Sequence, residues 1–322
     1  DEVFDVWTVP IDGGTTTRLR PFVTLAGSGV LGESEISPDG ERVLFRANFS
    51  DLDKLELWSA RVDGTGAVTR LNGTLNTGGG IPSSRFSPDS SRVVYRADQQ
   101  SAGVFELYSV PSAGGSAVKL NGLLTVGGDV ASYEISPDST RVIYLADQQV
   151  DTRVELFSVP LAGGGATKLN GTLPAGGGVS HALISPDSSR VVYRADEDTD
   201  NVYEIFSVPL AGGSAVKLNP ALTADGDVQA PAISPDSARV VYIADQNDDE
   251  VDELFSVPLA GGASVRVSDD LAVGGDVVSF KIAPASDFVF YVADLATDCV
   301  HELFRGSIFE ISGADVRVSG PM

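Results

Sequence analysis

Hydrophobic and polar positions alternate along short stretches of the chain, and Gly, Pro, Asn and Asp interrupt them every few residues. No stretch has an apolar period of 3.6 residues, so the pattern predicts strands and turns rather than helices. In one representative segment the expected strands cover residues 132–135, 141–146, 154–159 and 166–169. The chain is therefore expected to be all-β.

This four-strand segment recurs along the sequence. Its marker is Ile-Ser-Pro-Asp-Ser, which appears with small changes at 36–40, 86–90, 135–139, 184–188 and 233–237, and in a degraded copy at 282–286. The successive spacings are 50, 49, 49, 49 and 49 residues. Four strands in a repeat of about 40–50 residues are typical of a β-propeller blade. We expect residues 1–322 to form a single β-propeller domain with six four-stranded blades.

The repeat also resembles a known family. The run Ile-Ser-Pro-Asp-Ser-x-Arg-Val-Val-Tyr, followed by Glu-Leu-Phe-Ser-Val-Pro-x-Ala-Gly-Gly, is similar to the TolB-type, WD-like β-propeller repeat over about residues 30–320. The resemblance implies the fold. It does not specify a function, because the family includes periplasmic scaffolds, secreted proteins and the non-catalytic halves of peptidases.

The strand count exceeds six blades by two. Residues 4–14 match the third strand and turn of a repeat and residues 17–20 match the fourth, which gives 26 strands in all. We expect residues 1–20 to be a closing hairpin that pairs into the last blade and so removes an open edge. The tail at 301–322 would then be displaced and available for exchange with a neighbouring subunit. The alternative is seven blades, one of them partial.

Charge and composition exclude several classes of partner. The chain carries 22 Lys and Arg against 45 Asp and Glu, a formal net charge of −23, so phosphate backbones and anionic membranes repel it. No apolar run approaches the roughly 20 residues of a membrane helix. We expect no nucleic-acid partner and no membrane insertion. We expect an extracellular or cell-surface location, with the periplasm as the alternative, after removal of a signal peptide.

Few residues suit catalysis. The only histidines are His181 and His301, and Cys299 is the only cysteine, so no disulfide forms within the chain. Nucleophile-elbow, phosphate-loop and zinc-protease motifs do not occur in the sequence. No catalytic residue is therefore assigned and the protein is expected not to be an enzyme. A lyase or hydrolase, the least favoured alternative, would depend on His181 with Arg85 and Tyr133.

One repeated pattern suggests a metal. An acidic or amide residue ends the second strand of each repeat and a Glu begins the third, eight residues later, so two like charges face each other across a hairpin. Either an Arg two residues before the Asp or a bound cation would compensate them. Oxygen-rich loops suit Ca²⁺. The predicted ligands are Asp147, Asp151 and Glu155 in repeat three, Asp196, Asp198, Asp200 and Glu204 in repeat four, and Asp245, Asn247, Asp249 and Glu253 in repeat five.

Together these features predict a non-enzymatic propeller that works by protein–protein contact. The favoured version is a self-assembling structural subunit of a filament or surface layer, whose partner is a second copy of itself. The alternative is a Ca²⁺-dependent module that binds an extracellular glycan or peptide. Sequons at Asn48, Asn72 and Asn170 are compatible with glycosylation in a suitable host.

Overall fold

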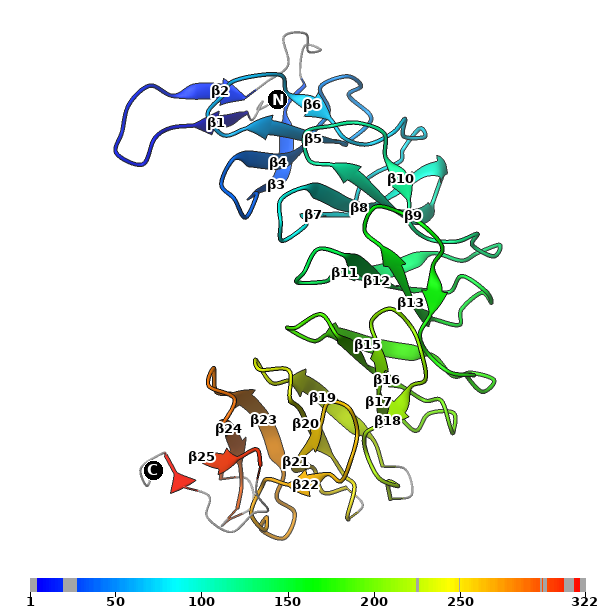
Figure 1. The fold of residues 1–322 in the computed structure, drawn as a ribbon, viewed down its shortest axis with the longest axis vertical. Helices are drawn as coiled ribbons and strands as arrows, with labels where there is room; N and C mark the ends of the chain where they lie inside the picture. The colour runs from blue at the N-terminus through cyan, green and yellow to red at the C-terminus, as the bar shows by residue number, and fades with distance from the viewer. Residues whose placement is uncertain are drawn as a thin grey trace. The chain divides into compact units, whose positions relative to one another are not determined.

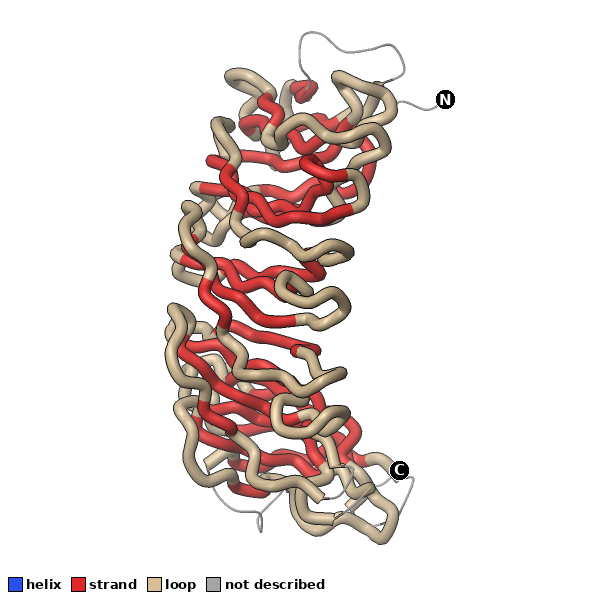
Figure 2. Tube along the Cα trace, turned by 90° about the vertical axis from the view of Figure 1, so that its right-hand side faces the viewer, coloured by secondary structure: helices blue, strands red, loops and turns tan. Residues whose placement is uncertain are grey.

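A computed structural model describes residues 5–19, 28–223, 226–248, 250–295, 297, 300–309 and 316–318. All regular structure in these ranges is β-strand, as the colouring of Figure 2 shows, so the all-β prediction is confirmed. No helix in the described ranges is long and apolar enough to cross a membrane.

The strands form one two-stranded and six four-stranded antiparallel sheets (Figure 1). The two-stranded sheet pairs β1 (Val6–Thr8) with β2 (Thr17–Leu19). Sheets one to three contain β3 (Val30–Ile36), β4 (Arg42–Ala47), β5 (Glu56–Arg61) and β6 (Thr69–Arg70); β7 (Ser83–Phe86), β8 (Arg92–Ser101), β9 (Val104–Pro111) and β10 (Val118–Lys119); β11 (Val130–Ile135), β12 (Arg141–Ala146), β13 (Glu155–Pro160) and β14 (Thr167–Lys168). Sheets four to six contain β15 (Val179–Ile184), β16 (Arg190–Ala195), β17 (Glu204–Pro209) and β18 (Val216–Lys217); β19 (Val228–Ile233), β20 (Arg239–Ala244), β21 (Glu253–Pro258) and β22 (Val265–Arg266); β23 (Val277–Ile282), β24 (Phe288–Ala293), β25 (Glu302–Ser307) and β26 (Val316–Arg317).

The predicted count of six sheets is not supported, whereas the alternative of seven with one partial sheet is. The last sheet contains its own third and fourth strands, β25 and β26. The N-terminal pair β1–β2 is a separate sheet and does not replace them. Within this chain the described parts of residues 301–322 lie in the last sheet, and exchange of the tail with a neighbouring subunit stays a prediction.

The chain divides into two compact units, Asp1–Thr152 with Phe157–Thr167, and Arg153–Leu156 with Lys168–Met322. The first unit contains the β1–β2 hairpin, the first two sheets and most of the third. The second contains the remainder of the third sheet and the last three sheets.

Within each unit, apolar side chains fill the junctions between consecutive sheets. At the junction of sheets four and five, sheet four contributes Val192, Ile205 and Leu218, a surface that we call the trailing face. Sheet five contributes what we call its leading face, which includes the buried residues Val240, Tyr242, Ala244, Phe255 and Val257. The same division holds where sheet five meets sheet six. Each complete sheet is thus apolar on both faces, which is why its strands read as almost continuous hydrophobic runs.

Stacked aromatic pairs lie on the leading face of five sheets. A second-strand Tyr lies directly opposite a third-strand aromatic residue, as Tyr242 does opposite Phe255, with ring centroids 5.5 Å apart and ring planes 23° apart. Stacked aromatic pairs contribute about 0.5–1.5 kcal/mol beyond the area they bury. The other four stacked pairs are Tyr95–Tyr108, Tyr144–Phe157, Tyr193–Phe206 and Tyr291–Phe304.

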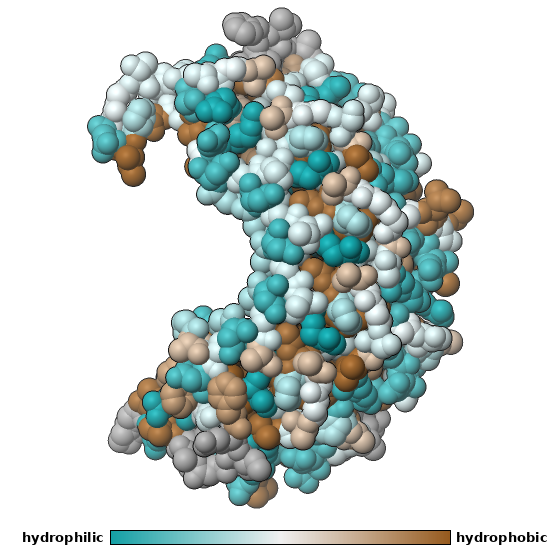
Figure 3. Space-filling view, viewed as in Figure 1, coloured by the Kyte–Doolittle hydropathy of each residue, from teal (hydrophilic) through white to brown (hydrophobic). Residues whose placement is uncertain are grey.

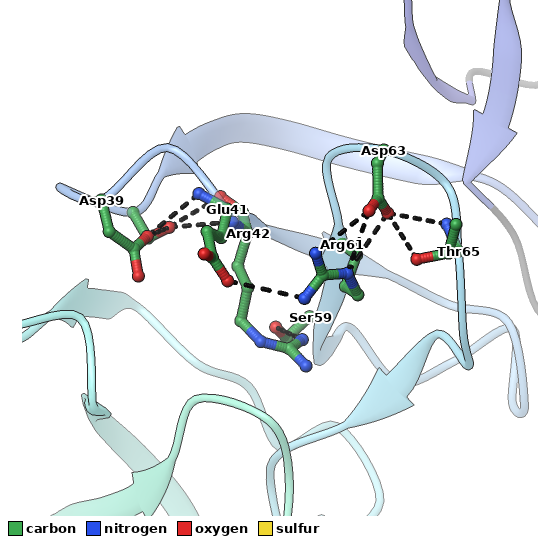
Figure 4. A network of polar contacts seen from close by, with 8 residues as sticks. Asp39, Glu41, Arg42, Ser59, Arg61, Asp63 and Thr65 are labelled. Carbon is green, nitrogen blue, oxygen red and sulfur yellow. Dashed lines mark hydrogen bonds and ion pairs between the residues drawn. The ribbon is translucent and has the colours of Figure 1, made fainter.

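The Ser-Pro-Asp turn of each repeat is held by hydrogen bonds. In sheet two, the Ser87 hydroxyl donates to Asp89 at 2.5 Å, and the Asp89 amide donates at 2.9 Å to the hydroxyl of Ser139, which belongs to the turn of the next repeat. Arg92, three residues after the turn Asp, donates to Ser109 on the third strand. Figure 4 shows the equivalent contact of Arg42 with Ser59 in sheet one.

Candidate functional sites in the acidic loops

The Asp that ends the second strand ties its hairpin loop to the segment before the first strand. In sheet four, Asp196 is only 1% exposed and accepts the amide of Gly178 at 2.6 Å and the amide of Asn201 at 3.0 Å. Asn201 has a φ of 63°, a left-handed conformation that Asn tolerates better than most residues. Both carboxylate oxygens thus bind backbone N–H groups. Corresponding bonds to the upstream segment are made by Asp98, Asp147, Asp245 and Asp294.

The Glu that begins the third strand is paired with a basic residue of the fourth strand. In sheet two, the Lys119 ammonium lies 2.7 Å from the carboxylate of the buried Glu106. In this sheet the Lys of the fourth strand, rather than the preceding Arg, therefore supplies charge compensation for the Glu. The six pairs are Glu56–Arg70, Glu106–Lys119, Glu155–Lys168, Glu204–Lys217, Glu253–Arg266 and Glu302–Arg317.

The Arg residues that we expected to compensate the acids have another role. Arg46 donates at 2.9 Å to the carbonyl of Ile81, which precedes the first strand of the next sheet. Arg194 donates to the carbonyl of Val228, the first residue of β19 in the next sheet, and its guanidinium lies 3.9 Å from the ring centroid of Tyr203. These arginines link consecutive sheets instead of neutralising the Asp and Glu of their own hairpin.

The structure places the predicted calcium ligands of sheet four at three separate positions. Asp196 binds backbone amides, Lys217 bridges Glu204 and Asp198, and the exposed Asp200 lies beside Gly176. In the described part of the chain, no group of three or more His, Cys, Asp and Glu side chains is close enough to hold a metal ion.

The other two predicted calcium loops are divided in the same way. In sheet three, Asp147 binds the amides of Asp129 and Thr152, Asp151 lies beside Gly127, and Glu155 pairs with Lys168. In sheet five, Asp245 binds the amide of Asp227, and Asn247 donates to Glu253 at 2.6 Å. Asp249 lies outside the described residues. Calcium binding stays a prediction.

Two buried carboxylate oxygens in these loops are unsatisfied. Oε2 of Glu155 and Oε2 of Glu204 have no hydrogen-bond donor. In three other sheets the same oxygen receives a donor, from Ser50, Tyr108 or Asn247. Burial raises the pKa of Glu204, against the lowering effect of Lys217. A buried acceptor without a donor costs about 1–3 kcal/mol, so sheets three and four are where a cation or a water would stabilise the loop most.

Asp252 is the titratable group in these loops with the clearest consequence for stability. Its carboxylate oxygens each lie 3.2 Å from Nε2 of Gln229. Burial, followed by the charges of Asp276, Asp245 and Asp227, raises the pKa of Asp252 from 3.8 to about 6. Because the folded pKa is higher than the unfolded one, the associated stability is fully present below about pH 4 and is lost as the pH rises through about 6.

We therefore expect Asp252→Asn to stabilise the fold above about pH 7 and to have no effect below about pH 4. A shift of two pKa units corresponds to about 3 kcal/mol, and partial solvent exposure reduces this to about 1 kcal/mol. Urea unfolding across this pH range measures the difference from the wild type. Asp248→Asn, at an exposed position of the same loop, is the matched control. A gain that did not change with pH would contradict the assignment.

The residues considered for catalysis lie in different environments. In the second unit, His181 lines a cavity of about 420 Å³ with Ser180, Arg194 and Gln229, and burial together with the Arg194 charge lowers its pKa. In the first unit, the Tyr133 hydroxyl donates to the carbonyl of Val94 at 3.0 Å. Burial raises the pKa of Tyr133, whereas the nearby charge of Arg85 lowers it. Cys299 lies outside the described residues.

Comparisons with known proteins extend the fold assignment. No protein-family model matches the chain, and no curated protein matches its sequence. A structure from a study of two prolyl endopeptidases is similar with a TM-score of 0.54 and 14% identity, over 94% of this chain and 44% of that chain. Putative TolB from Agrobacterium tumefaciens has a TM-score of 0.41 and 17% identity, over 78% of this chain and 83% of that one. TolB from Acinetobacter baumannii has a TM-score of 0.41 and 14% identity, over 85% of this chain and 60% of that one.

These likenesses concern the fold. The chain spans less than half of the endopeptidase chain that it matches. The endopeptidase match and the observed sheets together support the predicted β-propeller fold, and at these identities activity and partners do not transfer.

Proposed function

We propose that this chain is a non-enzymatic, secreted or surface-displayed β-propeller that acts by protein–protein contact, as a self-assembling structural subunit. The observation that carries the proposal is the incomplete N-terminal sheet. Two strands, β1 and β2, occupy a position where every other repeat has four. Trp7 on β1 is 57% exposed and Val9 is 54% exposed. A short strand with an uncovered apolar surface favours association with another polypeptide.

A second candidate function has one supporting observation. The unsatisfied Oε2 of Glu204 lies in the same loop as Asp198, and an anionic pair of this kind favours a small cation. A Ca²⁺-dependent module that binds a glycan or peptide is therefore the alternative. The same cation would also screen the net charge of −23, which opposes contact between copies.

We expect the wild-type protein to form oligomers or filaments as salt or Ca²⁺ is added, and Trp7→Glu to prevent this. A charge at this exposed position cannot be buried against an apolar partner without a large desolvation cost. Analytical ultracentrifugation and negative-stain microscopy, with calcium or with a chelator, measure the assembly. Leu123→Glu is the matched control, since Leu123 is 89% exposed on a loop of the same unit. A wild-type protein that is monomeric under every condition would contradict the proposal.

A further inference from the structure

A polar cavity lies between the first two complete sheets, and all of its lining residues belong to the first unit. Its volume is about 420 Å³, within the range of about 300–1,000 Å³ that small-molecule sites have. Hydrophilic side chains are visible at the surface over these two sheets (Figure 3). The polar lining residues are Ser34, Glu35, Arg46, Ser83, Ser84 and Arg85. The cavity thus has the size and the polar lining of a small-ligand site.

Two backbone irregularities border the cavity. Where β3 pairs with β4, residues 31–33 lie opposite Arg46 alone, so β3 has a bulge at this point. In sheet two, the pairing of β7 with β8 begins at Ser83, and the preceding Pro82 has no N–H to donate to a neighbouring strand. Bulges are common beside binding and active sites, where they redirect side chains. Regular strand pairing is thus interrupted on both sides of the cavity.

Arg46 is held in place at one wall of the cavity. Its Nη1 donates to the carbonyl of Ile81 at 2.9 Å. Gly32 lies in the bulge with a φ of 87°, and a Cβ at this position would lie 3.0 Å from Nη2 of Arg46. The glycine therefore allows the guanidinium to lie close against the backbone. A guanidinium has five N–H donors and this carbonyl accepts one of them, so Arg46 retains donors for a further acceptor.

The equivalent cavity of the second unit, between sheets four and five, contains a carboxylate of the chain itself. Asp227 accepts the amide of Tyr203, the residue before the third strand, at 2.7 Å. Asp227 also lies 3.9 Å from the guanidinium of Arg194, which corresponds to Arg46 in the repeat. At this position an arginine and a backbone amide thus have one carboxylate beside them. The same bond from amide to Asp joins Phe105 to Asp129 and Asp252 to Asp276.

Between sheets one and two, a glycine takes the place of this Asp. Gly80 corresponds to Asp227 in the repeat, and Leu55 corresponds to Tyr203. Among the described residues, the Leu55 amide has no acceptor and Arg46 has no carboxylate partner. A Cβ added to Gly80 would meet no heavy atom within 4 Å. The first unit therefore has both donors and open space beside them, without a carboxylate of its own.

Other polar groups of the cavity also have unused hydrogen-bonding capacity. Within the described ranges, the hydroxyls of Ser34 and Ser84 have no hydrogen-bond partner, and the Arg85 side chain has neither an ion pair nor a hydrogen bond. Burial raises the pKa of Glu35, against the lowering effects of the Phe86 amide and the Arg85 charge. Two guanidinium groups against one carboxyl give the described charged groups of the cavity a net positive charge. This local charge favours an anion, although the whole chain carries −23.

We infer that this cavity binds a small hydroxylated carboxylate, whose carboxylate takes the place that the Asp227 side chain has in the second unit. Arg46 and the Leu55 amide bind that carboxylate, and a pair of guanidinium and carboxylate is among the stronger hydrogen-bonded contacts in proteins. The serine hydroxyls, Glu35 and Arg85 bind hydroxyl groups of the same molecule. Such a binding site is independent of the proposed self-assembly, because all of its residues lie within one unit.

Two substitutions of Gly80 provide the main test. Gly80→Asp supplies the carboxylate that the other junctions have, so it should weaken the binding of gluconate and malate about ten-fold or more, since a tethered carboxylate competes at a high effective concentration. Gly80→Ala is the matched control, because it adds a Cβ without a charge and should bind both compounds like the wild type. Isothermal titration calorimetry on the full chain measures the affinities, and circular dichroism checks that each variant is folded.

A charge substitution at the wall of the cavity gives a second measurement. Arg85→Gln should weaken gluconate binding about ten-fold, the loss expected for one hydrogen bond to a charged group. Arg61→Gln makes the same change of net charge at the other end of β5 from Leu55, outside the cavity, and should have little effect.

The choice of ligands tests the chemical class. Glucose lacks the carboxylate and acetate lacks the hydroxyl groups, so each should bind more weakly than gluconate. Failure of the wild type to bind gluconate or malate, or equal affinities in Gly80→Asp and Gly80→Ala, would overturn the inference. Inorganic phosphate that binds as tightly as gluconate would overturn the assignment of a carboxylate.

Discussion

Replacing Asp196 with Ala should destabilise the protein by about 3–4 kcal/mol. The substitution leaves the partly buried amide of Gly178 and the amide of Asn201 without acceptors, and each lost bond of this kind costs about 1–3 kcal/mol. Asp196→Asn should lose less, because its single carbonyl oxygen still accepts one of the two amides. Urea unfolding monitored by circular dichroism gives the free energies.

The matched control is Asp200→Ala, in the same loop. Asp200 is exposed, so its removal changes the net charge by the same amount and should change stability by less than about 0.5 kcal/mol. Both variants are measured with a chelator and with Ca²⁺. If Asp196 serves only as the loop clasp, calcium leaves the difference between the two variants unchanged. A large loss in Asp200→Ala that appears only with calcium would show that the loop holds the ion as the sequence pattern predicted.

The fold could be predicted from the sequence because each repeat contains recognisable strand segments separated by turn residues. The spacing of the Ser-Pro-Asp turns and the alternation between them correctly predicted the four strands of each complete sheet. The number of sheets was harder, because the half repeat at 4–20 carries the same third- and fourth-strand residues whether it completes the last sheet or stands alone. Only the surface against which this half repeat packs distinguishes the two arrangements. Val6 and Leu19 pack against sheet one.

The charge pattern was recognised in the sequence but its partners were not. A Lys or Arg follows the third-strand Glu after 13 residues in four repeats, at Lys119, Lys168, Lys217 and Arg266. That regularity could have identified the ion pair, because the fourth strand returns antiparallel beside the third. Contacts between sheets, such as Arg46 with the carbonyl of Ile81, leave no such signal, since a backbone acceptor can belong to any residue.

For a physical reason, the sequence alone could not distinguish the clasp of Asp196 from metal chemistry. A carboxylate at the end of a strand and a loop rich in oxygen atoms suit a hard cation, and they suit a backbone N–H nest equally well. A residue in the left-handed conformation five positions after the Asp indicates the backbone N–H nest, because that conformation directs the amide of the residue into the loop. Gly103, Thr152 and Asn201 all have a positive φ, and residue type could have anticipated this for Gly103 and Asn201 but not for Thr152.

Replacing Lys168 with Met should destabilise the protein by about 2–3 kcal/mol. Glu155 is buried, its Oε2 has no donor, and Lys168 is the partner of its Oε1. Removing one member of a buried pair costs about 3–5 kcal/mol, and the 30% exposure of the Lys168 side chain reduces this through solvent screening. Urea unfolding of the variant against the wild type measures the loss.

The same change in another sheet separates the ion pair from general packing. Lys119→Met removes the partner of Glu106, but the Tyr108 hydroxyl still donates to that carboxylate at 2.6 Å. We expect its loss to be about half that of Lys168→Met. The double variant Glu155→Gln with Lys168→Met should recover most of the stability, because no unpaired charge stays buried. Equal losses at Lys168 and Lys119 with no recovery in the double variant would mean that the aliphatic parts of the lysines, rather than their charges, stabilise the fourth strand.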